Sequence, residues 1–281
     1  GGPRRAVASE QEERILSERR ISSARTFDAL PCIESKLSDV SLPLFEAYRM
    51  LAVDADTIAA NNRSIKEQLA SLRFYDLKHD CPTNAGIILF NKNPKHYFPG
   101  AYVQYLRFPG NSPTDIPVDQ AVVSGDLHSI VRELEIRVKA GIRNRLVHDS
   151  GFREKNIPDY PEWAVREFAM NAIMHRNYDS TMPVKLYWFS DRIEIQNSGG
   201  LYGEASPENF PTRNSYRNPI IAEAMKTLGF VNHFGYGVTR AIDLVKKNGS
   251  PKPDFSLEQQ AFEVVIHIKS EETDPQPDVR V

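Results

Sequence analysis

This sequence contains few cysteines, no excess of basic or acidic residues, and no long apolar segment. Of its 281 residues, 2 are cysteines, and 35 basic residues face 37 acidic ones, which leaves a formal net charge of −2. Two cysteines make neither a disulfide framework nor a cysteine-rich metal site, as is typical of a protein from a reducing cytoplasm. The balanced charge argues against a chain whose main task is to bind the phosphate backbone of nucleic acid.

The longest apolar runs are only of strand length. One of them is I-I-L-F from Ile87, and no apolar stretch of the signal-peptide type lies near the start. Neither a membrane span nor a secretory leader is therefore predicted. With 41% hydrophobic and 26% charged residues, the chain has the composition of a soluble globular protein and the length of one large or two moderate domains.

Both ends of the chain are polar. Arginines and glutamates are interleaved over residues 4–25, a pattern more typical of a solvated helix or a linker than of a nucleic-acid-binding arm. Residues 271–281, E-E-T-D-P-Q-P-D-V-R-V, have the composition of a disordered tail or a linker. The chain opens with Gly-Gly-Pro and no initiator methionine, so we expect it to be part of a longer protein.

Hydrophobic spacing predicts helices interspersed with hairpin-connected strands. Helices are expected over residues 44–50, after a capping box at 64–67, over 127–146, within 162–178, and over 219–228 and 238–247. Strands are expected over 86–90, 101–108, 184–189, 193–195, 254–257 and 262–268. This order predicts an α+β fold, in which a mixed sheet has helices packed on one face.

A polar stripe interrupts the helix expected within residues 162–178. Glu167, Asn171 and His175 are spaced four apart, so all three project from one face of a helix that is otherwise largely apolar. A solvated face would be richer in lysine and glutamate. The stripe is either a half-exposed face with a hydrogen-bonded asparagine or the wall of a ligand site.

Two glycine-containing turns and a polar loop follow this helix. Asn197, Gly199 and Gly200 end the hairpin, and Gly235-Tyr236-Gly237 runs directly into the last helix. The loop between them carries Arg213, Arg217 and Asn218. Each feature alone is ordinary turn or loop chemistry, and the two arginines are equally consistent with solvated charges. Their order along the chain is the stronger signal.

That order resembles the GHKL ATP-binding fold shared by DNA gyrase, mismatch-repair ATPases and histidine kinases. The resemblance implies a mixed-sheet α/β sandwich of the GHKL ATPase type, with ATP and Mg²⁺ as ligands. It implies that Asn171 holds the magnesium ion and that Glu167 is the general base. Gly235 and Gly237 would wrap the phosphates, and Arg213 or Arg217, in a candidate lid at residues 210–218, would close over the nucleotide.

The turn that reads adenine departs from the family pattern. If Asn197 takes the position of the family aspartate, Gly199 fits and Gly200 follows it, but Leu201 stands where the next glycine belongs. An amide oxygen can accept a hydrogen bond from the adenine amino group, although without the charge that strengthens such a bond. His175 and His233 have no third ligand at metal spacing and are expected to be structural.

Six motifs carry a closer resemblance. They are P-T-N-A-G-I-I-L-F from Pro82, Y-F-P-G-A from Tyr97, N-A-I-M-H-R-N-Y from Asn171, I-E-I-Q-N-S-G-G-L from Ile193, Y-R-N-P from Tyr216 and G-Y-G-V from Gly235. From about Phe27 onward the chain is similar to bacterial and archaeal proteins classed as transcriptional regulators. Those proteins join an N-terminal Schlafen-type AlbA domain to a divergent GHKL-like domain.

This resemblance implies a domain organisation. Residues 1–40 would be a linker or the end of a missing AlbA domain, 41–125 a smaller α/β connecting subdomain, 126–270 the ATP-binding domain, and 271–281 a disordered tail. Nucleic acid would then be bound only through the missing domain.

Two functions of different class follow from these observations. The first is an ATP-binding, slowly hydrolysing regulatory module that dimerises on binding its nucleotide. The second is a nucleotide-independent, degenerate GHKL fold kept for dimerisation or for binding a partner. Because the balanced charge disfavours it, direct binding of DNA by this chain is a weaker third hypothesis.

Overall fold

The computed structural model describes residues 25–148, 154–213, 215–232 and 235–268. The helices in this part are α2 (Leu42–Ala52), α3 (Ala55–Ala59), α4 (Ile65–Ser71), α5 (Asn84–Phe90), α6 (Leu127–Gly141), α7 (Glu162–His175), α8 (Pro219–Thr227) and α9 (Gly237–Lys247). The strands are β1 (Tyr75–Asp76), β2 (Cys81–Pro82), β3 (Val103–Arg107), β4 (Asp119–Val123), β5 (Asn144–His148), β6 (Glu154–Pro158), β7 (Val184–Trp188), β8 (Arg192–Ser198), β9 (Asp254–Leu257) and β10 (Ala261–His267).

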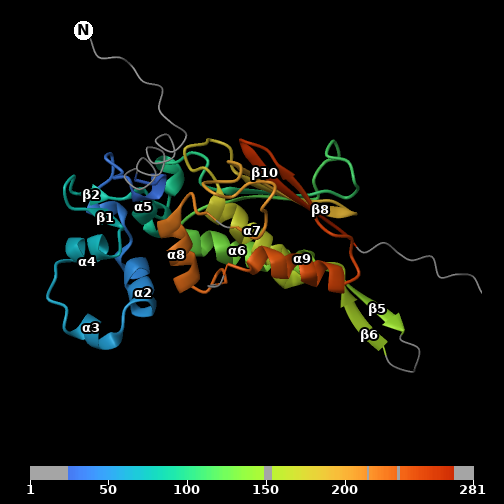
Figure 1. Ribbon diagram of the computed structural model, residues 1–281, viewed down its shortest axis with the longest axis horizontal. Coiled ribbons are helices and arrows are strands. Elements are labelled where there is room, and N and C mark those ends of the chain that lie inside the picture. The colour runs from blue at the N-terminus through green and yellow to red at the C-terminus, as the bar shows by residue number, and fades with distance from the viewer. Residues whose placement is uncertain (1–24, 149–153, 214, 233–234, 269–281) are drawn as a thin grey trace, which may run out of the picture.

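A six-stranded mixed sheet confirms the predicted α+β fold. Its strand order is β4-β3-β7-β8-β10-β9, in which β3 and β7 run parallel and the other neighbours are antiparallel. Figure 1 shows α6, α7 and α9 side by side along one face of the sheet. Alternate residues of the central strands, such as Leu186, Ile195 and Ile266, are buried, as expected for a sheet with one covered face. Two of the six strands, β3 and β4, come from residues before 125.

Helix α7 occupies the centre of the helical layer and contacts both α6 and α9. It begins directly after Pro161, close to where the sequence predicted its start. At its other end, Asn218 Nδ2 donates to the carbonyl oxygens of Met174 and Arg176, at 3.0 and 2.8 Å. Because the last carbonyl groups of a helix have no partner within it, this side chain satisfies two of them.

The strand predicted over residues 86–90 is wrong, because these residues belong to helix α5. The Thr83 hydroxyl caps this helix by accepting a hydrogen bond from the Gly86 N–H at 3.2 Å. All seven residues of α5 are buried, so no polar face marks the helical period. A Cβ atom on Gly86 would lie 2.3 Å from the carbonyl oxygen of Phe74, so this close approach requires glycine.

The helix predicted over 127–146 ends earlier, at Gly141. A Cβ atom on Gly141 would lie 2.8 Å from the ring of Trp188, so the helix end packs directly against β7. The chain then leaves the helical layer as the β5–β6 hairpin, which extends away from the rest of the molecule in Figure 1. This hairpin and the edge strand β4 were not predicted.

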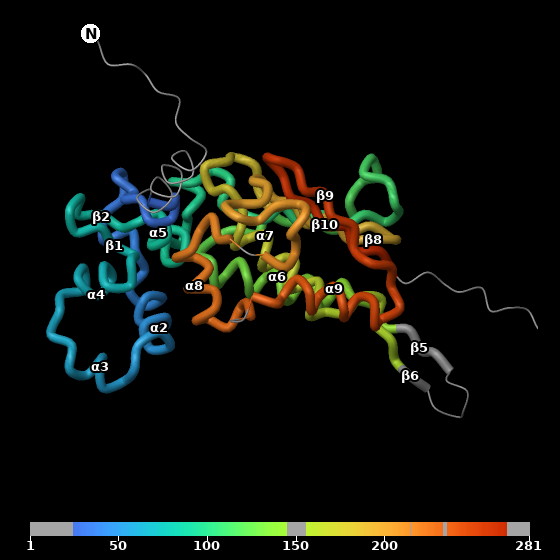
Figure 2. Tube along the Cα trace, viewed as in Figure 1, coloured from blue at the N-terminus to red at the C-terminus, as the bar shows by residue number. Residues whose placement is uncertain are grey.

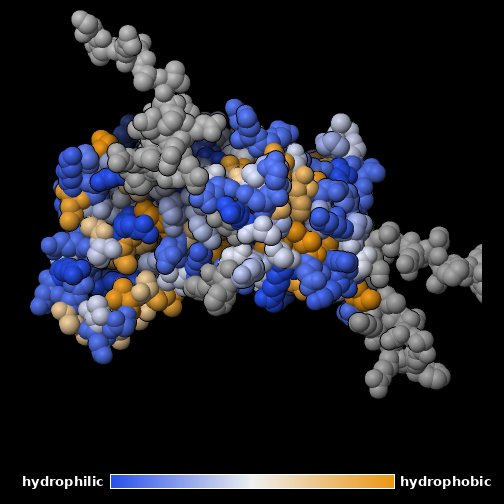
Figure 3. All heavy atoms as spheres, viewed as in Figure 1, coloured by the Kyte–Doolittle hydropathy of each residue, from blue (hydrophilic) through white to orange (hydrophobic). Residues whose placement is uncertain are grey.

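The residues before 100 pack onto the same hydrophobic core as the sheet. The core includes Cys32, Val40 and Phe45. Figure 2 shows α2, α3 and α4 grouped at one end of the molecule, and α2 contacts both α5 and α8. Figure 3 shows a largely hydrophilic surface with apolar residues near α2 and α3, where Met50 and Leu51 are exposed.

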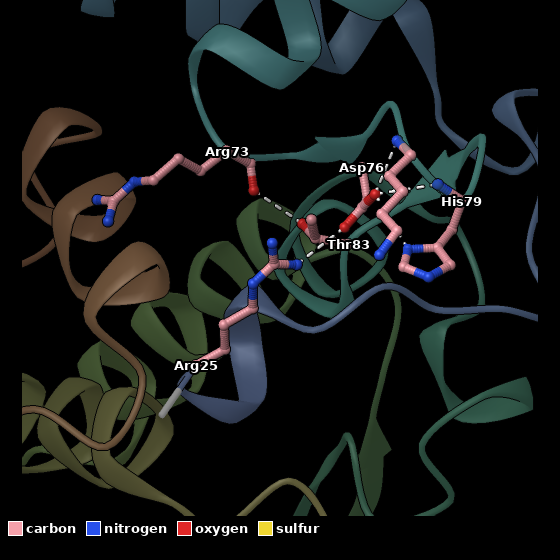
Figure 4. Close-up of polar contacts among 6 residues, drawn as sticks. Arg25, Arg73, Asp76, His79 and Thr83 are labelled. Atoms are coloured by element: carbon pink, nitrogen blue, oxygen red, sulfur yellow. Dashed lines mark hydrogen bonds and ion pairs between the residues drawn. The ribbon is translucent and has the colours of Figure 1, made fainter. Parts of the chain in front are cut away.

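The first described residues are tied to distant parts of the chain. Figure 4 shows Arg25 against Asp76, where the guanidinium Nη1 lies 3.0 Å from the carboxylate Oδ2. The other oxygen of Asp76 accepts hydrogen bonds from the backbone N–H groups of Lys78 and His79. Asp76 therefore both shapes the turn between β1 and β2 and holds Arg25 in place.

The mixed-charge segment before Arg25 and the acidic tail lie outside the described residues, as does His233. Among the residues that the structure does describe, no helix is both long and apolar enough to cross a membrane.

Candidate functional site

Three segments that are far apart in the sequence meet beside α7. They are the polar face of α7 itself, the end of β8, and the start of α9. The chain between β8 and α8 runs past the end of α7, where Tyr216 and Asn218 contact it (Figure 2). The site is therefore built from the segments that the sequence order singled out.

Glu167 and Asn171 form a hydrogen-bonded pair on α7. Asn171 Nδ2 donates to Glu167 Oε1 at 3.0 Å and to the Glu167 carbonyl oxygen at 2.8 Å. Glu167 is only 3% exposed, and this burial raises the pKa of its carboxyl group against the lowering effect of the Asn171 bond. Among the described residues, nothing donates a hydrogen bond to the amide oxygen of Asn171, so this acceptor remains available to a ligand.

The start of α9 lies directly against Glu167. A Cβ atom on Gly237, the first residue of α9, would come within 1.6 Å of Glu167 Oε1. Only glycine lets the helix begin this close to the carboxylate. Tyr236, at the N-cap position of α9, makes no side-chain capping bond. Gly235 has a φ of 72°, which glycine adopts without strain.

The end of β8 packs against the turn between β9 and β10. Asn197 is buried, and its Nδ2 donates to the carbonyl oxygens of Ser198 and Gly199 at 3.2 and 3.4 Å. Gly199 has a φ of 89°, and a Cβ atom on Gly200 would lie 2.0 Å from the carbonyl oxygen of Glu258. Both glycines are thus required by the backbone, and the Asn197 amide helps to shape the turn.

A cleft opens between these segments. Five of the predicted site residues line it: Asn171, Asn197, Gly199, Gly200 and Arg213. Its free space is about 60 Å³, room for only a few water molecules. Ligand pockets are usually on the order of 300–1,000 Å³, so the cleft is narrow for a nucleotide.

The other predicted residues border the cleft without lining it. Glu167 and Gly237 lie together behind Asn171. Arg217 lies behind the glycine turn, where its Nη2 donates to the Gly200 carbonyl oxygen at 3.3 Å and its guanidinium stacks on Tyr202 at 4.8 Å. Burial lowers the pKa of Arg217, and its buried Nε atom has no hydrogen-bond partner within the part of the chain that the structure describes.

Arg213 differs from Arg217 in its surroundings. Its side chain is exposed, and its ion pair with Glu204 is 3.6 Å long. Such an exposed pair contributes little to stability. Arg213 is therefore free to change its position, whereas Arg217 fastens the loop to the end of β8.

The aromatic part of the cleft was not predicted. Tyr202, Phe210 and Phe262 line it. Phe262 pairs with Asn197 across β10 and β8, so its position depends on strand register. Phe210 lies in an irregular loop without periodicity. No sequence signal indicated these three residues.

His175, expected to be structural, also lines the cleft. Its ring stacks on Tyr216 with the centroids 5.5 Å apart and an angle of 12°. Burial, together with the nearby cations of Arg217 and Lys226, lowers the pKa of His175 to about 4. The polar stripe of α7 therefore runs from Glu167, behind the cleft, to a neutral histidine at its edge.

The donor set suits magnesium better than a transition metal. Within the described ranges, no group of three or more His, Cys, Asp or Glu side chains could hold a metal ion. Magnesium needs few protein ligands, because it keeps several waters and binds substrate phosphates. The available amide oxygen of Asn171 fits that requirement.

Comparison with known proteins identifies an ATPase-like domain. Residues 181–266 match the family described as "Putative ATP-dependent DNA helicase recG C-terminal". The match covers less than a third of the chain and begins after α7, so it includes the glycine turns but neither Glu167 nor Asn171. No curated protein matches the sequence.

A solved structure shares the fold over most of this chain. The DIP2311 protein from Corynebacterium diphtheriae superposes with a TM-score of 0.67 at 20% sequence identity. The similarity covers 90% of this chain and 49% of that chain, so this chain spans about half of its length. At this identity the comparison concerns the fold alone.

Proposed function

We propose that this chain is a magnesium-dependent ATP-binding module. The observation that carries the proposal is the arrangement of Glu167, Asn171 and Gly237: a buried carboxylate, an available amide oxygen and a helix that starts with glycine, in direct contact. The match of residues 181–266 to an ATPase-like family supports the same assignment.

Each part has a chemical role in this proposal. The N–H groups at the start of α9 bind the phosphates, because a helix N-terminus favours anions and glycine lets the backbone approach closely. Asn171 Oδ1 binds magnesium, which neutralises phosphate charge when it is bound. Glu167 orients and deprotonates the attacking water. Arg213, which is exposed, closes over the nucleotide from the loop, while Arg217 holds that loop at the glycine turn.

The regulatory part of the proposal rests on the motif resemblance. In this proposal the module hydrolyses ATP slowly, forms a homodimer when ATP binds, and acts in the cytoplasm on an upstream Schlafen-type AlbA domain that contacts nucleic acid. The module would then be the part of a transcriptional regulator that couples ATP binding to the AlbA domain.

Calorimetric titration of ATP, with and without magnesium, tests the binding proposal. Wild type should bind ATP more tightly with magnesium, and Asn171→Ala should lose that increment while keeping the magnesium-independent part. Asn62→Ala, an exposed asparagine on the surface, is the matched control and should behave as wild type. No binding by wild type at millimolar ATP would reject the proposal and favour a nucleotide-independent dimerisation or partner-binding module.

A second series of variants tests whether Asn197 binds the adenine base. Among the residues that the structure describes, none donates a hydrogen bond to its amide oxygen, whereas Nδ2 is occupied by the turn. Asn197→Asp should keep or strengthen ATP binding, because a charged acceptor strengthens the bond to the adenine amino group. Asn197→Leu should lose binding. Equal ATP affinity in all three proteins would assign Asn197 to turn structure alone.

A further inference from the structure

The loop between β8 and α8 has to move before a nucleotide can enter the narrow cleft. Tyr202, Phe210 and Arg213 of this loop form one wall of the cleft. The other walls come from α7, the sheet and Val238 of α9, and both Val238 and Phe262 of the sheet pack against the hydrophobic core. Opening of the cleft must therefore displace the loop.

Three consecutive residues hold the end of this loop. Tyr216 stacks on His175, with the ring centroids 5.5 Å apart. Arg217 donates to the carbonyl oxygen of Gly200 at 3.3 Å. Asn218 is fully buried and caps the end of α7. The loop thus enters α8 from a position fixed on both the helix and the sheet.

The first turn of α8 is held from the opposite end of the described chain. Asp28 Oδ2 accepts hydrogen bonds from the backbone N–H groups of Ile220 and Ile221, at 2.7 and 3.1 Å. Asp28 is fully buried, and its Oδ1 accepts a bond from the Thr26 hydroxyl at 2.6 Å. First-turn N–H groups have no acceptor within their own helix, so displacing α8 would leave them and the carboxylate unsatisfied.

The same short segment also packs against Tyr178, which follows the end of α7. The ring of Phe27 lies parallel to that of Tyr178, with the centroids 6.5 Å apart and an angle of 7°. The Tyr178 hydroxyl donates to the carbonyl oxygen of Ile173 in α7 at 3.0 Å. Arg25 is held beside β1 by Asp76 (Figure 4). Residues 25–28 therefore contact α8 directly through Asp28 and are linked to α7 through Tyr178.

We propose that Asp28 is a positioning residue that holds the nucleotide cleft in its narrow form. The inference rests on the proposed function, since it assigns a control to the same ATP site. If only the open form admits ATP, the measured affinity falls with the fraction of molecules that are open. Because coupling between two sites is reciprocal, ATP binding should in turn weaken the hydrogen bonds between Asp28 and the first turn of α8.

The test compares ATP affinity in variants of Asp28 and of Thr26, which orients it. Asp28→Ala removes both bonds to α8 and should bind ATP with magnesium at least about fivefold more tightly, the lower end of typical coupling. Thr26→Val removes only the hydroxyl that orients Asp28 and should change affinity in the same direction by less. Asp126→Ala is the matched control, because Asp126 is also a buried carboxylate that caps a helix, here α6, and it does not line the cleft.

Hydrogen exchange in the unsubstituted protein provides an independent readout. Saturating ATP with magnesium should speed exchange at the Ile220 and Ile221 amides, while the capped Ser129 amide of α6 stays unchanged. If wild type binds ATP but Asp28→Ala and Thr26→Val bind no more tightly, Asp28 is only a helix cap and the coupling is wrong. If Asp28→Ala fails to fold, the ATP affinity of Thr26→Val and the exchange rates decide whether Asp28 and ATP binding are coupled. Absence of ATP binding in wild type would reject the proposed function, and the coupling with it.

Discussion

Glu167 combines burial, a hydrogen bond from the Asn171 amide and contact with the start of a helix in one position. Its carboxylate touches Asn171 and the first residue of α9, and it is the only carboxylate in the polar stripe of α7. A group with a pKa raised by burial is a better base near neutral pH than an exposed glutamate. This makes Glu167 the residue on which hydrolysis is best tested.

Glu167→Gln should separate ATP binding from hydrolysis. Glutamine keeps the size and a hydrogen-bond acceptor for Asn171, so ATP affinity should be retained. Turnover should fall by roughly a hundredfold or more, as is typical when a general base is lost. Phosphate release against pH should also show an acid limb at a pKa above the ordinary 4.5 in wild type only, because the carboxylate must be deprotonated to act.

The same measurements can contradict this role. Unchanged turnover in Glu167→Gln would mean that another group is the base. Should wild type bind ATP and never release phosphate, Glu167 would be structural and the module a ligand sensor.

His175 makes stability depend on pH on the acid side. Its folded-state pKa of about 4 lies below the ordinary 6.5, so the unfolded chain binds the proton more readily between these values. Stability is then complete above about pH 6.5 and is lost as the pH falls toward 4, by up to about 3 kcal/mol. His175→Phe keeps a ring for Tyr216 and should remove most of this loss.

Urea unfolding at several pH values between 4 and 7 measures the effect. A wild-type profile that His175→Phe does not flatten would show that His175 is already charged in the folded protein. His79, which is part-exposed beside Asp76, provides a control histidine. His79→Phe should leave the slope that is due to His175 in place.

At the scale of elements, the contact between α7 and α9 determines the shape of the site. Alanine normally stabilises a helix relative to glycine by about 1 kcal/mol. At position 237, however, a Cβ atom would overlap Glu167 Oε1, and overpacking of a core costs about 1–3 kcal/mol. The cost of the overlap should exceed the gain in helix propensity, so we expect Gly237→Ala to destabilise the fold and to weaken ATP binding.

A double-mutant cycle checks this explanation. Glu167→Ala combined with Gly237→Ala removes the clashing carboxylate, so the two changes should be non-additive by about 1 kcal/mol or more. Thr239→Ala, at an exposed position of the same helix, is the control for helix propensity. Simple additivity in the cycle would mean that α9 tolerates the methyl group by shifting elsewhere.

At the scale of the whole molecule, Arg176 joins two of the sequence motifs. It is buried, stacks on Tyr178 at 4.6 Å, and donates to the carbonyl oxygens of Gly100, Ser180 and Met182. The Y-F-P-G-A motif before β3 and the N-A-I-M-H-R-N-Y motif at the end of α7 are therefore in direct contact. A side chain of this kind links the first parallel strand of the sheet to its central helix.

Arg176→Ala should destabilise the whole fold by about 3 kcal/mol or more, because several buried carbonyl groups lose a charged donor. Equilibrium unfolding in urea measures the change. Arg132→Ala, on the exposed face of α6, should stay within about 0.5 kcal/mol of wild type. A loss at position 176 no larger than this control would mean that water replaces the guanidinium.

Assembly is the second test at this scale. If ATP binding drives formation of a homodimer, sedimentation velocity should show a larger species when ATP and magnesium are added. Asn171→Ala, which loses magnesium-dependent binding, should not show it. A larger species that is independent of ATP would favour the alternative module, whose function is association without nucleotide.

The sequence by itself determined the elements with a clear period and clear ends. Alternating strands such as β7 and β10, and helices α7, α8 and α9, lie close to their predicted positions, because one face of each is buried and the other is not. The capping box at Ser64 also starts α4 as predicted. The spacing of Glu167 and Asn171 likewise determined that they would share one helix face.

Tertiary structure decided what local patterns could not show. Helix α5 is buried on all sides and thus lacks the polar face that distinguishes a helix from a strand. The meeting of Glu167 with Gly237, of Asn197 with Phe262, and of Asp28 with the start of α8 depends on how strands and helices pack. Such contacts join residues far apart in the chain, and no local period encodes their distance. The narrowness of the cleft likewise arises only when the loop packs against α7.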